Sequence, residues 1–551
     1  MAMTYRPRDL HRESNTMEMV KRRMTTRYSL EPMTVLVLVV CFCLFSASAL
    51  LFKSLGTLDD MTHYLVARYA WAHPQLLVDI WGRPAYTILS SPFAQFGVQA
   101  AGFFNILVSV LACYVAAKIA AILQVRSWPA AVFTAIQPFF LRLSSSTLTE
   151  PLFALLLAAA ILLYFRCHFL QSALCVSLLP LTRLEGFAFV IVWLFLLIRR
   201  GELRAAISLF LFPVLWNAGG FVVTTDPLFL WRYNPYYTSG DYGYGTWTHY
   251  IWLWPAINGP ILLPLISVGL LCGITRRGNL LHILTILFFI IQTVVYRIGY
   301  GSAGYERFFV CIAPLLGVIA AQGLHYLFEE APALRRDMHT NNLVLGSLKQ
   351  TAMPIVILIL LVGQTILITW WLFQPNPPVG RLHVIASWLV AFLAIVMTIR
   401  RRRPNRILWT ALIVLLTAIT FLYTTRWVRP DQVDTAFEAL WADAAHWYAT
   451  SEWQRQPVLA LHPFFWIAAN RDPYTRLDRF NWDQLDPQSA SLGTIILWDS
   501  DLGSKKRRCS VDFFNADQFR IIRSWETLHE DTKFQIIAFE KVNTLPPCDA
   551  S

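Results

Sequence analysis

Charged residues are scarce in this chain: Asp, Glu, Lys and Arg make up only 15% of its 551 residues, while 56% are hydrophobic. Soluble domains carry roughly 25% charged residues, so an ordinary soluble protein is excluded. The apolar residues fall in repeated runs of about 20, the length of a helix that crosses a bilayer. The sequence therefore predicts a polytopic membrane protein.

Cysteine patterns that hold metals are also missing. The nine cysteines include no CxxC pair and no metal-like spacing. Seven of them lie in or beside apolar runs, where packing is the ordinary role of a thiol: Cys41, Cys43, Cys113, Cys167, Cys175, Cys272 and Cys311. Cys509 and Cys548 lie in the polar tail and either stay as two thiols or form a disulfide. That disulfide would close a loop of about 40 residues and contribute about 4 kcal/mol.

The net charge of +12 does not indicate a nucleic-acid partner. Basic residues occur in short clusters between apolar runs, which is the pattern that sets membrane orientation. The basic segment 1–31 is thus predicted to be cytoplasmic. Ala47-Ser48-Ala49 resembles a signal cleavage site, but we interpret the run at 32–52 as an uncleaved anchor, because it is long enough to span and follows a long polar segment.

A count of about 13 spans satisfies both apolar length and charge. The spans are predicted near residues 32–52, 98–122, 128–142, 148–165, 168–182, 186–199, 204–223, 251–273, 279–297, 307–327, 353–373, 382–399 and 407–424. With this count the arginine clusters between spans all fall on the cytoplasmic side. The short spans between 128 and 199 leave open that two of them form one re-entrant hairpin.

The predicted spans divide the chain into three parts: a cytoplasmic segment at 1–31, a transmembrane domain at 32–424 and an extracytoplasmic domain at 425–551. In the first outer loop, two amphipathic stretches are too short or too polar to span and are predicted as helices lying at the membrane interface: Met61–Trp71 and Pro84–Phe96.

The polar tail at 425–551 has helical spacing at Phe437–Tyr448. Four further stretches are typical of strands: Val458–Ile467, Gly493–Trp498, Phe519–Ile522 and Phe534–Phe539. The tail is thus predicted as a small α/β domain.

Carboxylates gather at the outer boundary of the membrane. Asp59 and Asp60 directly follow the first span, and Glu150 lies in the Ser144–Pro151 corner. A carboxylate at this depth is costly and often functional, as a general base or as a ligand of a divalent metal. The alternative is structural, because Asp and Glu also stabilise helix N-termini.

Arginines and aromatic residues occur on the same predicted face. Arg83, in Trp81-Gly82-Arg83-Pro84, and Arg307, at the start of a span, suit a phosphate partner. They also suit anchoring at lipid headgroups. Arg183 and Glu185 form either part of the same site or a structural ion pair. Tyr242 and Trp247, in the aromatic loop 224–250, are predicted either to line an acceptor entrance or to lie in an interfacial belt.

These motifs resemble the GT-C class of polytopic glycosyltransferases over roughly residues 30 to 330. The resemblance rests on five stretches: Leu58-Asp59-Asp60 through His63-Tyr64, Trp81-Gly82-Arg83-Pro84, Thr147-Leu148-Thr149-Glu150-Pro151, Thr182-Arg183-Leu184-Glu185-Gly186 and Gly304-Tyr305-Glu306-Arg307-Phe308. It implies a catalytic acid in the first loop, Asp59 or Asp60, assisted by Glu150. Other members often have DE or ED where this chain has DD, so the choice between the two stays open. Together with the loop residues Tyr242 and Trp247, the charged and aromatic residues of these stretches are predicted to bind substrate: His63, Arg83, Arg183, Glu185, Tyr305, Glu306 and Arg307.

The resemblance also implies a reaction. A sugar would pass from a polyprenyl-phosphate donor to a glycan, lipid or protein acceptor at the extracytoplasmic face of the cell membrane. No cofactor is required by the residues, although a divalent metal is left open. The alternatives are a transporter or flippase of lipid-linked sugars, which predicts paired half-helices and mid-membrane charges, and a non-catalytic assembly protein, which would not need the acidic loop.

Overall fold

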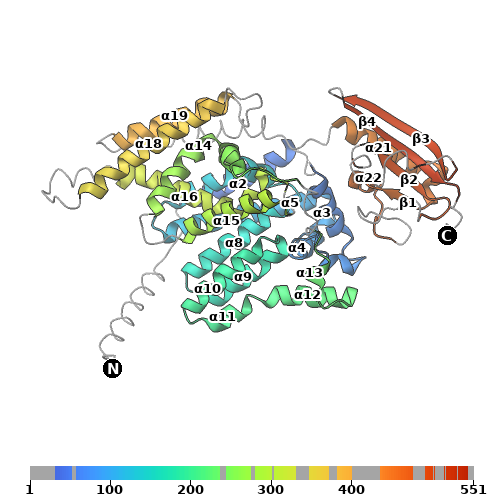
Figure 1. Ribbon diagram of the computed structural model, residues 1–551, viewed down its shortest axis with the longest axis horizontal. Coiled ribbons are helices and arrows are strands. Elements are labelled where there is room, and N and C mark those ends of the chain that lie inside the picture. Colours follow the sequence, from blue (N-terminus) through green and yellow to red (C-terminus); the bar gives the residue numbers. More distant parts are fainter. Residues whose placement is uncertain are drawn as a thin grey trace.

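The computed structural model describes residues 32–51, 57–235, 243–274, 280–300, 303–330, 347–371, 381–399, 435–475, 490–500, 502, 514, 517–529 and 532–543. Most of this chain is helical, and a small sheet forms near its C-terminus (Figure 1). The predicted class, a helix bundle with a small α/β domain, is confirmed. The span predicted at 407–424, Tyr242, Cys509 and Cys548 lie outside the described residues.

Five stretches of described helix are long and apolar enough to cross a membrane. They are α2 (Pro32–Leu51), α5 (Val98–Ile122), α11 with α12 (Leu203–Ser208 and Leu211–Thr224), α15 (Leu280–Ile298) and η3 with α16 and η4 (Glu306–Ile312, Ala313–His325 and Tyr326–Glu330). A sixth candidate, α14 (His249–Ile274), bends by 114° at Gly259. Gly259 has φ 73°, which only glycine adopts at no steric cost, and this permits the break.

Several spans predicted between 128 and 199 are shorter than a bilayer requires. Three of them, with 16, 14 and 14 residues, are α8 (Glu150–Phe165), α9 (Phe169–Thr182) and α10 (Gly186–Arg199). A full span needs about 20 residues. The stretch predicted as one span at 128–142 is two helices, α6 (Ser127–Ala135) and α7 (Pro138–Leu143), because Pro138 lacks the N–H that would continue α6. The count of about 13 spans stays a prediction.

The helical body packs around one large apolar cluster. Its central aromatic side chains come from helices far apart in sequence and are at most 1% exposed: Phe153, Phe189, Trp193, Phe288 and Phe309. Burying a side chain of this size contributes roughly 2–3 kcal/mol. Two further helices, α18 (Ser347–Trp371) and α19 (Arg381–Ile399), pair with each other and pack against α14.

The first outer loop folds into α3 (Leu58–Tyr69), η1 (Pro74–Val78) and α4 (Pro84–Ala94), and a short α13 (Phe229–Arg232) packs nearby against α12. Both predicted interface helices are therefore helical. α3 is more enclosed than a helix lying on a bilayer, because eight successive residues, Asp60 to Ala67, are buried. Its neighbours are α4 and the C-terminal domain, between which it lies (Figure 1).

The C-terminal domain combines helices with a four-stranded sheet. The helices are α21 (Thr435–Thr450), η5 (Glu452–Arg455) and α22 (Pro463–Ala468). The strands, in the order β1-β2-β4-β3, are β1 (Val458–Ala460), β2 (Ile495–Asp499), β3 (Phe519–His529) and β4 (Thr532–Lys541). β1 runs parallel to β2, and the other pairs are antiparallel.

One strand prediction in this domain is wrong. The strand expected over Val458–Ile467 ends at Ala460, and α22 begins three residues later. The His462 side chain accepts a hydrogen bond of 3.2 Å from the backbone N–H of Phe464, and Pro463 occupies the first helical position, where its missing N–H costs nothing. The apolar run is continuous across both elements, so apolar character alone could not separate them.

Candidate active site

The two adjacent carboxylates of the first loop have different surroundings. Asp60 forms a capping box with Thr57: the Asp60 backbone N–H donates to Thr57 Oγ1, and the Thr57 N–H donates to the Asp60 carboxylate, both at 3.2 Å. Asp60 is only 3% exposed. Its carboxylate therefore satisfies the backbone N–H of Thr57 at the start of α3, which is a structural task.

The neighbouring Asp59 carboxylate contacts Arg307. The Arg307 guanidinium donates to the Asp59 carboxylate and also, at 3.5 Å, to Thr57 Oγ1. The Asp59 side chain remains 42% exposed. Burial alone would raise the pKa of Asp59, but the charge and hydrogen bond of Arg307, together with neighbouring groups such as Arg183, lower that pKa. Asp59 is thus an ionised carboxylate that a substrate can reach.

The Asp59–Arg307 pair is the first link of a longer chain of charges. Arg307 Nε lies 3.9 Å from Glu150 Oε1, and Arg183 Nη1 lies 2.9 Å from the same oxygen. Arg183 Nη2 then reaches Glu185 Oε1 at 3.0 Å. The Glu150 side chain is 2% exposed. We call Asp59, Arg307, Glu150, Arg183 and Glu185 the charge network; it joins four separate regions of the chain.

Glu185 is firmly ionised within this network. Burial would raise the pKa of its carboxyl, but Arg183, with a smaller effect from Arg83, lowers it to about 2. Gln292, on α15, donates to Glu185 Oε1 at 3.1 Å. The sequence offered a signal for Gln292 that was missed: an amide inside an otherwise apolar run.

A buried corner brings Glu150 next to α3. Asn105, in the middle of α5, donates through Nδ2 to the carbonyls of Ser146 at 2.7 Å and Leu148 at 2.8 Å. The Thr147 hydroxyl donates to the carbonyl of Asp60 at 2.7 Å. These bonds satisfy backbone groups of a buried turn, which would otherwise be costly. Asn105 is a second polar residue within an apolar run that sequence reasoning overlooked.

His63 lies on the buried face of α3 among aromatic rings. Its imidazole stacks on Trp81 with ring centroids 4.6 Å apart, and Tyr86 meets it edge-on at 5.8 Å. Burial lowers the pKa of His63 to about 3, against the opposing effect of Asp59. His63 is therefore neutral across physiological pH and packs more than it titrates.

Arg83 adopts an uncommon backbone conformation. It precedes Pro84 at the start of α4 with φ 62° and ψ 88°, and it is only 8% exposed. A non-glycine residue in the left-handed region costs of order 1–3 kcal/mol, and such residues cluster at functional sites. Its positive charge lowers the pKa of both His63 and Glu185, so Arg83 borders the charge network.

Aromatic rings cover the two arginines of the network. The Arg307 guanidinium carbon lies 4.7 Å from the Tyr305 ring centroid, and that of Arg183 lies 4.6 Å from the Phe308 ring centroid. Such cation–π contacts fix a guanidinium plane while leaving its N–H groups available at the edge. Glu306, which lies between Tyr305 and Phe308 in the sequence, is the first residue of η3. Trp247, by contrast, is 58% exposed, and its ring centroid lies 5.9 Å from the guanidinium carbon of Arg297.

Solved structures of ArnT from Cupriavidus metallidurans share this architecture. The apo structure aligns with a TM-score of 0.56 at 13% sequence identity, and the structure bound to undecaprenyl phosphate aligns with a TM-score of 0.55 at 12%. Each alignment covers 92% of this chain and 97% of the ArnT chain. The chain has a GT-C-like fold. No protein-family model and no curated protein sequence matches it.

The GT-C-like fold confirms the resemblance that the sequence motifs implied, at the level of architecture. The similarity covers 92% of the chain, whereas the sequence motifs spanned only residues 30 to 330. Among the described residues, no group of three or more His, Cys, Asp or Glu side chains is arranged to hold a metal ion. The network carboxylates have guanidinium groups as their charged partners instead.

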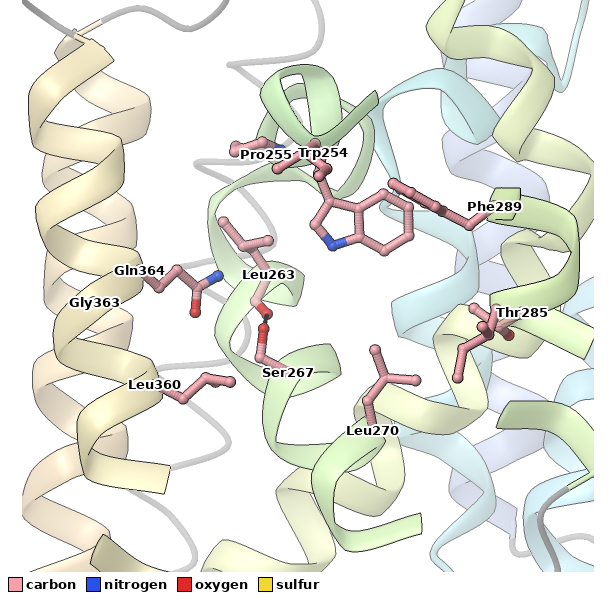
Figure 2. A pocket seen from close by; sticks show the side chains of 12 residues that line it. Trp254, Pro255, Leu263, Ser267, Leu270, Thr285, Phe289, Leu360, Gly363 and Gln364 are labelled. Atoms are coloured by element: carbon pink, nitrogen blue, oxygen red, sulfur yellow. Dashed lines mark hydrogen bonds between the residues drawn. The ribbon is translucent and has the colours of Figure 1, made fainter. Parts of the chain in front are cut away.

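Within the GT-C-like fold, an apolar cavity of about 510 Å³ lies between α14, α15 and α18. Figure 2 shows Trp254 and Phe289 on one side of it and Leu360 and Gln364, from α18, on the other. The Gln364 Oε1 and Thr285 Oγ1 atoms have no hydrogen-bond partner in the part of the chain that the structure describes. An aromatic contact joins the cavity to η3, since the Trp254 and Phe309 ring centroids are 5.5 Å apart.

Proposed function

We propose that this protein is an integral-membrane glycosyltransferase that moves a sugar from a polyprenyl-phosphate donor to an acceptor on the extracytoplasmic face. The observation that carries the proposal is the reachable, ionised carboxylate of Asp59, held beside Arg307 within a GT-C-like fold. ArnT, whose structure aligns over 92% of the chain, was solved with undecaprenyl phosphate bound. That ligand supports a lipid phosphate as the leaving group.

Asp59 is proposed as the general base. It would accept a proton from the acceptor group as that group attacks the anomeric carbon, while the bond from that carbon to the phosphate oxygen breaks. Arg307 would stabilise the charge on the departing phosphate, with Arg183 and Arg83 nearby. Glu150 would keep the two network arginines in place rather than touch the reacting atoms, because its side chain is only 2% exposed.

The pairing of Asp59 with Arg307 also suggests how the base is activated. In the free protein Arg307 lowers the pKa of Asp59, which makes it a weak base. A donor phosphate offers Arg307 a competing acceptor, and a guanidinium turned toward phosphate would release Asp59. The pKa of Asp59 would then rise when the donor is bound, so base strength would depend on donor binding.

The apolar cavity is the proposed place for the polyprenyl chain. Its lining is mostly hydrophobic, with Ser267, Thr285 and Gln364 as polar members, and Phe309 connects it to the segment that carries Arg307. A chain in this cavity would bury its isoprene units while its phosphate reached the charge network. The C-terminal domain contacts α3, so the domain and Asp59 share one side of the membrane; the basic segment 1–31 is proposed to be on the other, cytoplasmic side.

The test is turnover of a radiolabelled polyprenyl-phosphate sugar by the purified protein in liposomes that contain a membrane extract as acceptor source. We expect release of polyprenyl phosphate together with label on an acceptor. Label that crosses to the opposite leaflet without cleavage of the sugar–phosphate bond would make the protein a transporter and overturn the proposal. Absence of both turnover and transport would leave the assembly role in its place.

A further inference from the structure

The loop at residues 470–474 of the C-terminal domain lies against the carboxyl-terminal end of α3. Arg68 Nη2 donates to Asn470 Oδ1 at 2.8 Å, and His73 Nε2 lies 2.7 Å from Asp472 Oδ2. The Tyr474 ring centroid is 6.1 Å from that of His73. We call these contacts the α3 seam. They join residues about 400 positions apart in the sequence, the separation being 402 for the first pair and 399 for the second.

The loop is firmly tied to the domain that carries it. Arg471, between the two seam residues, points into the domain and donates to the Gln454 carbonyl at 2.9 Å and to the Tyr448 hydroxyl. The second oxygen of Asp472 accepts from the backbone N–H of Tyr474 at 2.9 Å. Asn470 has φ 49°, a conformation that Asn tolerates better than most residues. Arg471 therefore anchors the loop, while Asn470 contacts α3 and Asp472 contacts His73 just beyond the end of α3.

An apolar cluster continues below these polar contacts. Met61, Tyr64 and Leu65 of α3 share one buried cluster with Phe465 and Trp466 of α22, and each of these side chains is at most 3% exposed. Since the polar pairs lie at one end of this apolar contact, they fix the angle at which the two parts pack. The helix that carries Asp59 is thus partly embedded in the C-terminal domain.

The angle at which α3 packs against the C-terminal domain affects the position of Asp59. Asp59 and Arg68 lie near opposite ends of the helix, about 14 Å apart at the usual rise per residue. A helix tilt of about 10° would move Asp59 by roughly 2 Å. A misplacement of about 1 Å in a catalytic arrangement can cost about 100-fold in rate. The opposite neighbour, α4, also holds this end, because Gln95 Nε2 donates to the Arg68 carbonyl at 2.7 Å.

We propose that the C-terminal domain positions Asp59 through the α3 seam, so that Arg68, His73, Asn470 and Asp472 are positioning residues for the reaction. None of the four touches the charge network in the contacts described above. They set the tilt of α3 and so the place of Asp59 opposite Arg307. The consequence for catalysis rests on the proposed function, whereas the mechanical coupling between the domain and α3 does not.

A charge-exchange cycle in the full-length protein, reconstituted in lipid nanodiscs, tests the seam. His73→Asp and Asp472→His each place like groups opposite each other, and the double variant restores an imidazole–carboxylate pair in reversed order. We expect kcat to fall about tenfold in each single variant, with the donor KM within about twofold of wild type. The double variant should recover to within about threefold. Rescue of this kind separates the pair from either residue alone.

Hydrogen exchange of the α3 backbone amides is measured in the same variants, as a readout that does not need activity. We expect faster exchange over 61–67 in the single variants and recovery in the double variant. The matched control is Lys533→Glu, which reverses charge at the exposed Lys533–Glu526 pair of the same domain, at 2.7 Å; it should change neither kcat nor α3 exchange.

Two results would overturn the seam proposal: single variants with wild-type kcat and wild-type α3 exchange, in which case α4 alone holds the helix, or a fall in kcat without faster exchange and without rescue. If the wild-type protein transfers no sugar, the proposed function fails by itself. In that case the exchange measurement still decides whether the domain holds α3.

Discussion

The charge network of the helical body and the ion pairs of the C-terminal domain differ in their access to water. The Arg183–Glu150 pair has side chains 11% and 2% exposed, whereas Lys533 and Glu526 on the β3–β4 hairpin are 60% and 61% exposed. Exposed pairs contribute about 0–1 kcal/mol and carry little information. Buried ones pay a desolvation penalty that an apolar replacement would avoid. The burial of the Arg183–Glu150 pair therefore indicates a task other than stability.

The two regions also differ in how their buried polar groups are used. In the C-terminal domain, the buried His462 side chain caps α22 and stacks on Trp441, with ring centroids 5.2 Å apart. In the helical body, Asp60 performs a similar capping task, but the adjacent Asp59 does not. The contrast within this pair distinguishes a structural carboxylate, Asp60, from a candidate catalytic one, Asp59.

The largest expected effect is loss of sugar transfer in Asp59→Asn. Removing a general base costs roughly 100- to 10,000-fold, so turnover of the labelled donor should fall by at least about 100-fold. Asp60→Asn keeps an oxygen that can accept at the start of α3, and its turnover should stay within about tenfold of wild type. Full activity in Asp59→Asn with loss in Asp60→Asn would reverse the assignment.

The next effect concerns stability, and it contrasts the same substitution in both regions. Arg183→Ala removes the guanidinium that the buried carboxylates of Glu150 and Glu185 share, which should destabilise the helical body by about 3–5 kcal/mol. Arg520, the partner of Glu540, is 62% exposed. Arg520→Ala should therefore lower the free energy of unfolding by less than about 1 kcal/mol. Thermal unfolding in detergent measures both. Equal losses in the two variants would remove the distinction on which the site rests.

A smaller effect depends on pH and belongs to the C-terminal domain. Burial lowers the pKa of His462 to about 3, while an unfolded histidine titrates near 6.5. Between these values the unfolded state binds the extra proton, so His462 makes stability fall as pH drops below about 6.5. The loss reaches at most about 4 kcal/mol near pH 3.5.

His462→Asn tests this, because Asn retains a cap acceptor and does not titrate. Urea unfolding of the domain, followed by limited proteolysis of the full-length protein at pH 7 and pH 4, should show a smaller drop at pH 4 in the variant. An unchanged drop would assign the acid sensitivity to other groups.

The smallest expected effect is that of Lys533→Ala, which breaks the exposed pair with Glu526. Stability should change by less than about 0.5 kcal/mol, because solvent screens the pair and both side chains gain rotamer freedom. Urea unfolding of the same domain provides the measurement. A loss of several kcal/mol would mean that surface pairs in this domain carry as much energy as buried ones, contrary to the comparison above.

Much of the helical architecture could be predicted from local patterns. The run predicted at 98–122 is α5 with the same bounds, and α8, α9 and α10 begin within two residues of their predicted starts. Apolar length and proline position act locally, so they can be read directly. Bends and breaks were harder: the turn of α14 at Gly259 and the division at Pro138 depend on how neighbouring helices pack.

The candidate site was predicted in composition but not in arrangement. Asp59, Glu150, Arg183, Glu185 and Arg307 do form one network. Trp247 lies with Arg297 instead, and Tyr242 lies outside the described residues. Residues that support the site were missed when their signal was a single polar side chain within an apolar run, as with Asn105 and Gln292.

Local sequence patterns are enough to predict a polytopic membrane protein with an acidic pair after its first apolar run, because apolar length and clustered charge are properties of neighbouring residues. The folded structure was needed to show which carboxylate of the pair caps α3 and which contacts Arg307, 248 residues from Asp59. It also placed α22 and Asn470 of the C-terminal domain in contact with α3. Both outcomes depend on side chains brought together by packing, and such contacts leave no periodic pattern in the chain.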